Sequence, residues 1–186
     1  DGAYGAWSTE EATFTMQDSG SLSIDIVNSS DETVADTVSM SSISYSNTTV
    51  QDSTGTMPSG SNKLKIINSS GSKTWSVTIG PTSGSGAAWS NAGGTHHIDF
   101  NDTGGAGQLT INANAGTLTG VDGTSTTGVS KNGSTAFTGA SITLLSADDT
   151  APTTGTWTLT GVSLSQTIPA KTPATTYTIE LTITIS

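Results

Sequence analysis

The 186-residue chain contains no cysteine and no arginine, and it has only five lysines against fifteen acidic residues. The absence of cysteine excludes disulfide bonds and thiolate metal sites. Because the net charge is −10, the chain cannot neutralise a run of phosphates, and an anionic membrane surface would repel it. Nucleic acid and membrane binding are therefore excluded. Long hydrophobic runs are also absent, so no segment is expected to span a bilayer.

Large apolar residues are scarce as well. Leu, Ile, Val and Phe make up about 18% of the chain, below the roughly 20% at which disorder becomes the default expectation. Charged residues are only 11%, however, and disorder normally requires stronger self-repulsion. We therefore expect a folded domain with a small core, to which neighbouring subunits add buried surface.

What the chain has in abundance is hydroxyl groups, since serine and threonine supply about a third of its residues. This composition, together with the acidic balance, is typical of an exported surface protein. The sequence begins with Asp1-Gly2-Ala3 and no initiator methionine, as expected of a mature chain after removal of a secretion signal. We expect a secreted protein at the cell surface.

Apolar and polar residues alternate along most of the chain, which is the pattern of half-buried β-strands. The pattern predicts an all-β fold, an antiparallel β-sandwich of immunoglobulin-like or jelly-roll-like type. It predicts one sandwich domain over residues 18–186 and an N-terminal extension over residues 1–17, with at most one short helix near 8–11 or 87–91. The expected strands cover residues 12–16, 22–26, 38–45, 64–67, 75–79, 109–111, 118–121, 142–145, 157–164 and 177–185.

Two details of this pattern predict how strands pair. The turn sequence Asn68-Ser69-Ser70-Gly71 predicts that strands 64–67 and 75–79 form a hairpin. The last strand carries five apolar residues on one face and ends the chain. A long apolar strand is a liability at a free edge, so we expect it to lie inside a sheet.

One cluster has the residue types of a metal site. On a strand, His97, Asp99 and Asn101 share one face and present an imidazole and two oxygens. The spacing that follows, with Gly104-Gly105, resembles an oxygen-ligand calcium loop without its bidentate glutamate. The alternative is a surface turn without an ion, and we expect no cofactor, with calcium as the one exception to be considered.

Catalytic patterns are weak, and we expect the protein not to be an enzyme. Ser70-x-x-Lys73 matches a serine–lysine pattern, but neither of its companion motifs is present, and G-x-S-x-G is absent. The pair Asp148-Asp149 precedes a proline and has turn chemistry. Glycan attachment is permitted at the N-x-S/T sequons, which are at Asn28, Asn47, Asn68, Asn101 and Asn132.

Short motifs spread over about residues 62–186 resemble those of WxL-domain bacterial surface proteins. They are Gly155-Thr156-Trp157-Thr158-Leu159, Thr167-Ile168-Pro169-Ala170 and Tyr177-x-x-x-Leu181-Thr182, with Trp75-Ser76-Val77 in place of the family's earlier W-x-L. The family's second W-x-L is replaced by Ile183-Thr184-Ile185. The resemblance implies a secreted all-β module attached non-covalently to the cell wall. Its core and motif residues are Trp75, Trp157, Leu159, Tyr177, Leu181 and Ile183.

A looser resemblance, of architecture only, is to secreted β-sandwich pilins that polymerise by strand donation. It favours a structural subunit of an extracellular filament, in which the N-terminal segment of one copy completes the sheet of the next. The self-association partner is thus another copy of the chain. The residues expected to be donated are Tyr4, Trp7, Ala12, Phe14 and Met16.

Two alternatives remain open at this stage. The first is a monomeric WxL-like module that binds the cell wall or adheres to surface glycans. The second is a carbohydrate-binding or calcium-dependent adhesive domain that uses Trp89 and the Asp99 loop.

Overall fold

The computed structural model describes residues 20–103 and 105–186, and this part of the chain is built almost entirely of antiparallel strands. Its only helices are two single 3-10 turns, η1 (Gly84–Gly86) and η2 (Ala113–Ala115). The strands are β1 (Leu22–Val27), β2 (Gln51–Met57), β3 (Lys63–Asn68), β4 (Trp75–Pro81), β5 (Trp89–Asn91), β6 (His97–Ile98), β7 (Leu109–Asn112), β8 (Thr117–Gly120), β9 (Val129–Lys131), β10 (Ser134–Ala136), β11 (Ile142–Ala147), β12 (Gly155–Thr160), β13 (Val162–Ile168), β14 (Tyr177–Thr178) and β15 (Leu181–Ile185).

The first layer of the sandwich consists of two four-stranded sheets that are joined where β12 leads into β13. The strand orders are β1-β3-β12-β8 and β10-β7-β13-β2. Only Gly161 separates β12 from β13, and its φ of 71° gives the backbone a kink that glycine adopts without strain. On either side of this long strand, β2 leads into β3 and β7 leads into β8, so three strands run through both sheets.

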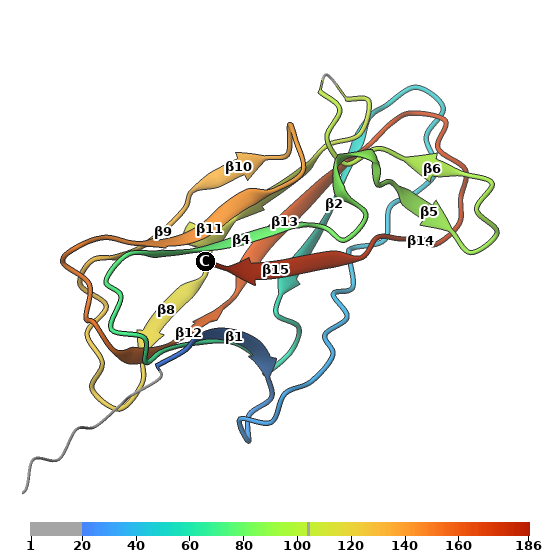
Figure 1. Cartoon of the computed structure of the whole chain (residues 1–186). Helices are drawn as coiled ribbons and strands as arrows, with labels where there is room; N and C mark the ends of the chain where they lie inside the picture. Colours follow the sequence, from blue (N-terminus) through green and yellow to red (C-terminus); the bar gives the residue numbers. More distant parts are fainter. Residues whose placement is uncertain (1–19, 104) are drawn as a thin grey trace, which may run out of the picture.

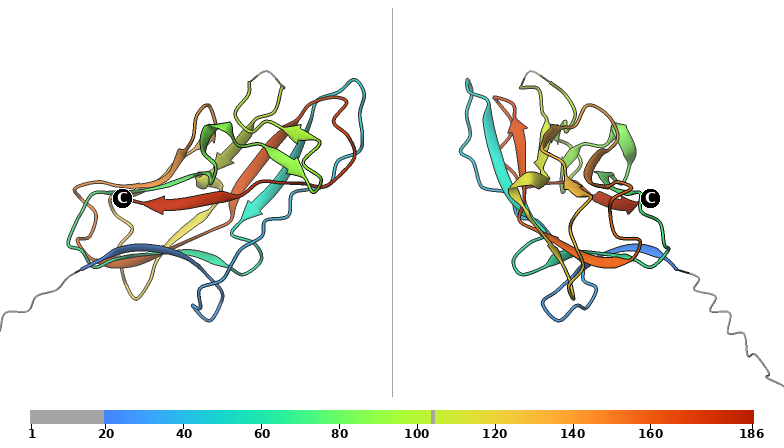
Figure 2. Two further views of the ribbon diagram at one scale, coloured as in Figure 1. Left: turned by 45° about the vertical axis from the view of Figure 1, so that its right-hand side comes forward. Right: turned by 90° about the vertical axis from the view of Figure 1, so that its left-hand side faces the viewer.

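The second layer is the sheet β15-β4-β11-β9, and a small sheet, β14-β5-β6, lies at one end of the molecule (Figure 1). Figure 2 shows β15 and β4 in a layer separate from β12 and β1. The short connection between β9 and β10 closes one long side of the sandwich, because β9 pairs with β11 in the second layer and β10 pairs with β7 in the first layer. The predicted all-β antiparallel sandwich is confirmed.

The core between the layers is formed by the alternating apolar residues of the strands. Trp75 on β4 packs against Trp157 on β12, with 5.4 Å between the ring centroids, and Phe100 packs edge-on against Phe137 at 5.3 Å. The indole N–H of Trp157 donates to the Ser125 carbonyl at 2.9 Å. Each such aromatic or aliphatic side chain stabilises the fold by about 1.5–3 kcal/mol when fully buried, and these contacts hold the two layers together.

Two of the predicted strand features are wrong, and one of the two candidate helix sites holds no helix. Residues 64–67 and 75–79 form strands but no hairpin, because β3 pairs with β1 and β12 whereas β4 pairs with β11 and β15. Residues 38–45 form no strand, although they run beside β2. The predicted helix site at 87–91 contains β5 instead, while the other predicted site, 8–11, lies outside the described residues.

The C-terminal strand also differs from the prediction. β15 is an edge strand that pairs only with β4. Its predicted phase is right, since Leu181, Ile183 and Ile185 pack toward the core and the threonines between them are exposed. These apolar residues are half-buried rather than buried. Within the described part of the chain, no helix has the length and hydrophobicity needed to cross a membrane.

Candidate functional site

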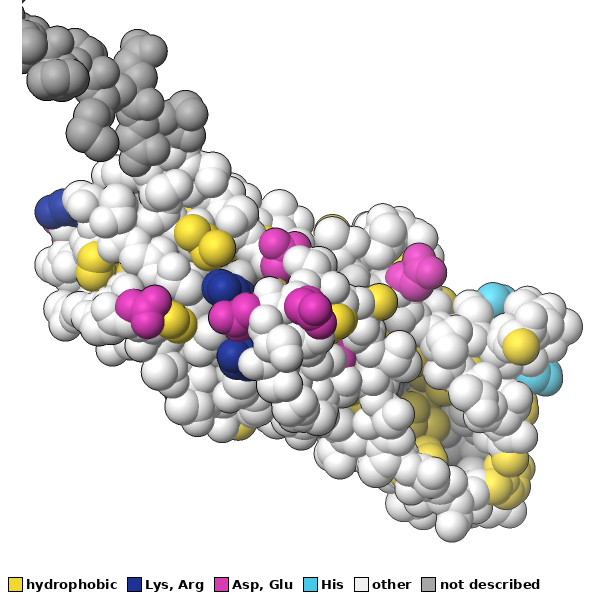
Figure 3. All heavy atoms as spheres, turned by 90° about the horizontal axis from the view of Figure 1, so that it is seen from below, with side chains coloured by type: hydrophobic (Ala, Val, Ile, Leu, Met, Phe, Trp, Pro, Cys, Tyr) yellow, Lys and Arg dark blue, Asp and Glu magenta, His cyan; other side chains and the backbone are white. Residues whose placement is uncertain are grey.

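A groove of about 510 Å³ opens at the end of the sandwich that carries β5, β6 and β14. One wall is residues 37–46, which we call the strap, and the other is the segment from Ile168 to Thr178. Among the described residues that line the groove, none is charged. Figure 3 shows hydrophobic side chains gathered in a hollow at this end of the molecule. An uncharged groove is notable in a chain with a net charge of −10.

The floor of the groove is fixed by a buried glutamine. Gln166 on β13 is only 2% exposed, and its side-chain carbonyl accepts a hydrogen bond from the Trp89 indole N–H at 2.7 Å. Its amide donates to the carbonyls of Asp99 and Thr167, both at 2.9 Å. The bonds to Trp89 and Asp99 join β13 to β5 and to the residue after β6, and the bond to Thr167 lies within β13.

The walls combine a local link with exposed apolar groups. The N–H of Lys171 donates to the Ser46 carbonyl at 2.7 Å and ties the two walls together at one point. The Tyr177 hydroxyl donates to the Pro173 carbonyl at 3.1 Å, and partial burial raises the pKa of this phenol above its ordinary value. On the strap, the exposed fractions are 37% for Ile43 and 61% for Tyr45. An exposed aromatic beside an apolar groove is typical of an interaction surface.

Beside the groove, β2 has an open edge. It pairs with β13 on one side, and its residues Asp52, Thr54 and Thr56 direct their backbone groups to the other side. Thr54 is bonded there, since its carbonyl accepts from the Ser41 N–H at 2.6 Å and its N–H donates to the Ser41 hydroxyl at 2.8 Å. In the described part of the chain, Asp52 and Thr56 have no backbone partner on that side. Such an edge is a template for a further strand.

The strap lies along this edge but is not part of the sheet. Its side chains Val38 and Met40 pack against the core beside Gly55, where a Cβ atom would lie 2.6 Å from the Met40 sulfur and 3.2 Å from a Val38 methyl carbon. A side chain at position 55 would therefore displace the Met40 side chain from its present position. A second hollow, of about 460 Å³, lies between the strap and residues 54–60. The strap therefore borders open surface on both of its sides.

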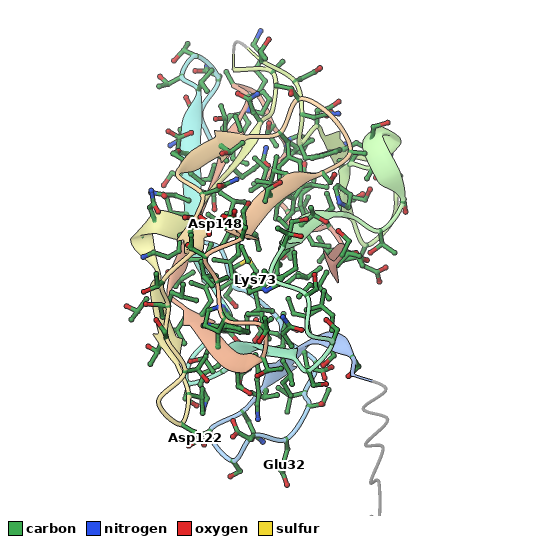
Figure 4. All side chains as sticks on the ribbon, turned by 60° about the vertical axis from the view of Figure 1, so that its left-hand side comes forward. Glu32, Lys73, Asp122 and Asp148 are labelled. Atoms are coloured by element: carbon green, nitrogen blue, oxygen red, sulfur yellow. The ribbon has the colours of Figure 1, made fainter. Side chains whose placement is uncertain are left out.

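The described chain begins at the opposite end of the molecule. Residue 20 lies against the backbone of Ser69, and β1 starts beside the end of β3, with Leu22 opposite Asn68. Figure 1 shows the start of β1 far from β5, β6 and β14. Figure 4 places Glu32 and Asp122 at this same end. The described chain therefore begins at the end of the molecule opposite to the uncharged groove.

The structure places the sequence-predicted residues in different environments. The proposed donor residues Tyr4, Trp7, Ala12, Phe14 and Met16 lie outside the described residues. Trp75, Trp157 and Leu159 are buried in the core. Tyr177 lines the groove, and Leu181 and Ile183 are half-buried on β15.

Each of the three residues predicted as metal ligands has a hydrogen-bond partner close to it in the fold. The His97 ring bonds through Nδ1 to the Ser90 hydroxyl at 2.9 Å, whereas Asp99 accepts from the N–H groups of Phe100 and Asn101. The side-chain amide of Asn101 donates to the Ser85 carbonyl at 3.2 Å. Across residues 20–103 and 105–186, no three His, Asp or Glu side chains are grouped as a metal site would require. These residues stabilise their loop.

One of the glycosylation sequons is corrected by the structure. Asn68 is buried, its amide donates to the Ser72 carbonyl at 2.6 Å, and its side-chain oxygen accepts from Ser70. A glycan cannot be attached there without unfolding the turn. Asn28, Asn101 and Asn132 are half-buried, with their side-chain amides bonded, and Asn47 is exposed at the tip of the loop after the strap. Asn47 is the sequon best placed for modification.

Sequence reasoning did not find the groove, because its lining comes from segments far apart in the chain. The one usable signal was Trp89, an aromatic residue outside the predicted strands. The sequence matches no family model, no curated protein and no solved structure.

Proposed function

We propose that this protein is the structural subunit of an extracellular filament and that it polymerises head-to-tail by donating its N-terminal segment to the groove end of the next copy. The observation that carries the proposal is the placement of the two partners. The open edge of β2 and the uncharged groove lie at one end, and the described chain begins at the other end. A contact between two different surfaces of one subunit leaves one of each surface free, and when the rotation between copies does not close a ring, repetition of the contact yields a filament.

The chemistry of the N-terminal segment matches that of the groove. Residues 12–17 read Ala-Thr-Phe-Thr-Met-Gln and carry no charge, and they are bracketed by Glu11 and Asp18. The groove carries no charge either among its described lining residues. Because every copy is strongly acidic, an uncharged strand entering an uncharged groove avoids most of the like-charge repulsion that other contacts between copies involve.

Magnitudes show what such a contact requires. Burying Phe14 and Met16 contributes about 1.5–3 kcal/mol each, whereas association costs about 4–15 kcal/mol in lost freedom of movement. Two side chains alone therefore do not hold two subunits together. Backbone bonds to the open edge of β2, each worth about 0.5–1.5 kcal/mol net, supply the rest together with other side chains. Loss of either contribution is expected to stop assembly.

The test is a pair of matched double variants of the full chain. Phe14→Asp with Met16→Asp places charges on the apolar face of the segment, and Thr13→Asp with Thr15→Asp places the same charges on the alternate face. We expect filaments, seen by negative-stain electron microscopy and by sedimentation, from the wild type and the threonine variant but not from the Phe14/Met16 variant. Circular dichroism verifies that all three are folded. Filaments of wild-type yield from the Phe14/Met16 variant would refute strand donation.

The alternative, a monomeric wall-binding or adhesive module, makes a different prediction for the same experiment. Its motif residues Trp75 and Trp157 are buried against each other and present no binding surface. A wild-type chain that remains monomeric at every concentration and sediments with isolated cell walls would favour the alternative over the filament.

A further inference from the structure

The strap lies along the open edge of β2, where a further strand of the sheet would pair. We infer that residues 13–17 of the next copy pair with the outer edge of β2 in the position that residues 37–41 hold in the free subunit. This inference rests on the proposed function and makes it specific: it names the edge, the register and the segment that must move. Residues 37–41 are then an internal placeholder that keeps the open edge covered until a second copy arrives.

The first argument is the weakness of the present contact. Over its whole length the strap makes one backbone–backbone hydrogen bond to β2, from the Ser41 N–H to the Thr54 carbonyl. Two further bonds, from the Ser53 hydroxyl to the Ser41 carbonyl and from the Thr54 N–H to the Ser41 hydroxyl, also involve Ser41, so the hydrogen bonds between strap and β2 are confined to one strap residue. By contrast, β13 is in register with all of β2, from Gln51 to Met57. Hollows of about 510 and 460 Å³ lie on the two sides of the strap. A segment with few backbone bonds and open surface on both sides is one that opens at low free-energy cost.

The second argument is a match between the two segments. Residues 37–41 read Thr-Val-Ser-Met-Ser, and residues 13–17 read Thr-Phe-Thr-Met-Gln. Both have an apolar residue in second place and methionine in fourth place, separated by residues with hydroxyl groups. In the strap, these two apolar side chains are the ones that pack beside Gly55. The same alternation lets the incoming segment place Phe14 where Val38 lies and Met16 where Met40 lies.

The third argument is that the exchange increases the buried surface. Phenylalanine is larger than valine, and the groove next to the strap provides unfilled space whose lining includes the apolar side chains Trp89, Ile98 and Ile168. Residue pairs along β2 also fix the direction, because Ser41 lies opposite Thr54 and Met40 beside Gly55, which is an antiparallel course. The incoming strand is therefore antiparallel to β2, and Gln17 faces Thr54.

The first experiment locks the strap in place. The hydroxyl oxygens of Ser41 and Thr54 are 3.4 Å apart, so Ser41→Cys with Thr54→Cys joins the strap to β2 by a disulfide. The matched control is Ser76→Cys with Ser186→Cys, whose hydroxyl oxygens are 3.3 Å apart on β4 and at the end of β15. Because the native chain has no cysteine, each variant contains only the intended disulfide.

We expect the oxidised Ser41/Thr54 variant to elongate filaments more slowly than the wild type by about tenfold or more, since the incoming strand loses its edge. Reduction with dithiothreitol is expected to restore the rate. The control is expected to elongate equally in both redox states. Elongation of the oxidised Ser41/Thr54 variant at the wild-type rate would overturn the placeholder while leaving strand donation intact, and a wild type that forms no filaments would overturn both.

The second experiment tests the register. Gln17→Cys with Thr54→Cys in one chain is expected to give covalent ladders of multiple subunits when filaments are oxidised and separated on a denaturing gel. Gln17→Cys with Thr182→Cys, which moves the acceptor to the outer face of β15, is expected to give no ladder. A ladder from the Thr182 pair and none from the Thr54 pair would place the donated strand elsewhere and refute the assigned edge.

Discussion

Replacing Gln166 by leucine is expected to destabilise the protein by about 2–4 kcal/mol, because it removes the three hydrogen bonds that fix the floor of the groove. Leucine fills nearly the same space but leaves the Trp89 indole N–H and the Asp99 and Thr167 carbonyls without this partner. A buried group without a partner costs about 1–3 kcal/mol. Trp89 and Asp99 are half-buried, so water replaces part of what is lost, which lowers the total.

Urea unfolding followed by tryptophan fluorescence measures this free energy. Ser165→Ala is the matched control, because Ser165 precedes Gln166 on β13 and lies on the opposite face, so a change below about 0.5 kcal/mol is expected. Trp89→Phe combined with Gln166→Leu in a double-mutant cycle is expected to be less destabilising than the sum of the single variants, by about 0.5 kcal/mol or more. If Gln166→Leu unfolds at the wild-type urea concentration, the assignment of a structural role to these bonds is wrong.

Three further predictions concern the sandwich itself. Gly120→Ala is expected to destabilise the fold by at least about 1–3 kcal/mol, because the new Cβ would lie 1.7 Å from the Thr124 carbonyl oxygen. Gly139→Ala is the control and should be tolerated, because its Cβ would have no atom within 4 Å. Thermal melts compare the two variants. Ile183→Asp, on the half-buried face of β15, is expected to lower the free energy of unfolding by about 1–3 kcal/mol. Thr182→Asp, on the exposed face, is expected to lower it by less than about 1 kcal/mol. Equal melting temperatures for the two variants would contradict the assigned phase of the strand. Thr150 donates two hydrogen bonds to Asp148, and these bonds hold the pKa of that carboxyl below its ordinary value. The resulting stabilisation is present above the unfolded-state pKa and is lost as pH falls through the folded-state pKa. Asp148→Ala should therefore lower the urea midpoint more near neutral pH than in strong acid, and an equal loss at both pH values would contradict this reasoning.

Strands with strong apolar alternation could be predicted from the sequence, and β1, β4, β7 and β15 occur where Leu22, Trp75, Leu109 and Leu181 marked them. β2 could not be predicted in this way, because Gln-Asp-Ser-Thr-Gly-Thr-Met has almost no apolar alternation. It is a strand because β13 pairs with it along its whole length. The strap shows the opposite case, in which Val38 and Met40 alternate as in a strand but no sheet partner continues the pairing.

Pairing between strands was the weakest part of the sequence analysis. Asn68 to Gly71 has the residues of a tight turn, yet the buried Asn68 side chain bonds the Ser72 carbonyl and the chain passes from one layer to the other. Local turn chemistry does not report which layer the next strand enters. The groove could not be predicted for the same reason, since its floor joins Gln166 and Trp89, which are 77 positions apart.

The long strand formed by β12 and β13 has a mechanical consequence. It runs along the length of the molecule, from the end where the described chain begins to the end with the groove (Figure 1), and neighbouring strands accompany it through both sheets. Tension applied between these two ends acts nearly parallel to the strands. The backbone hydrogen bonds are then loaded together in shear rather than opened one after another as in unzipping. A subunit with a small core can in this way resist tension along its long axis much better than its thermal stability indicates.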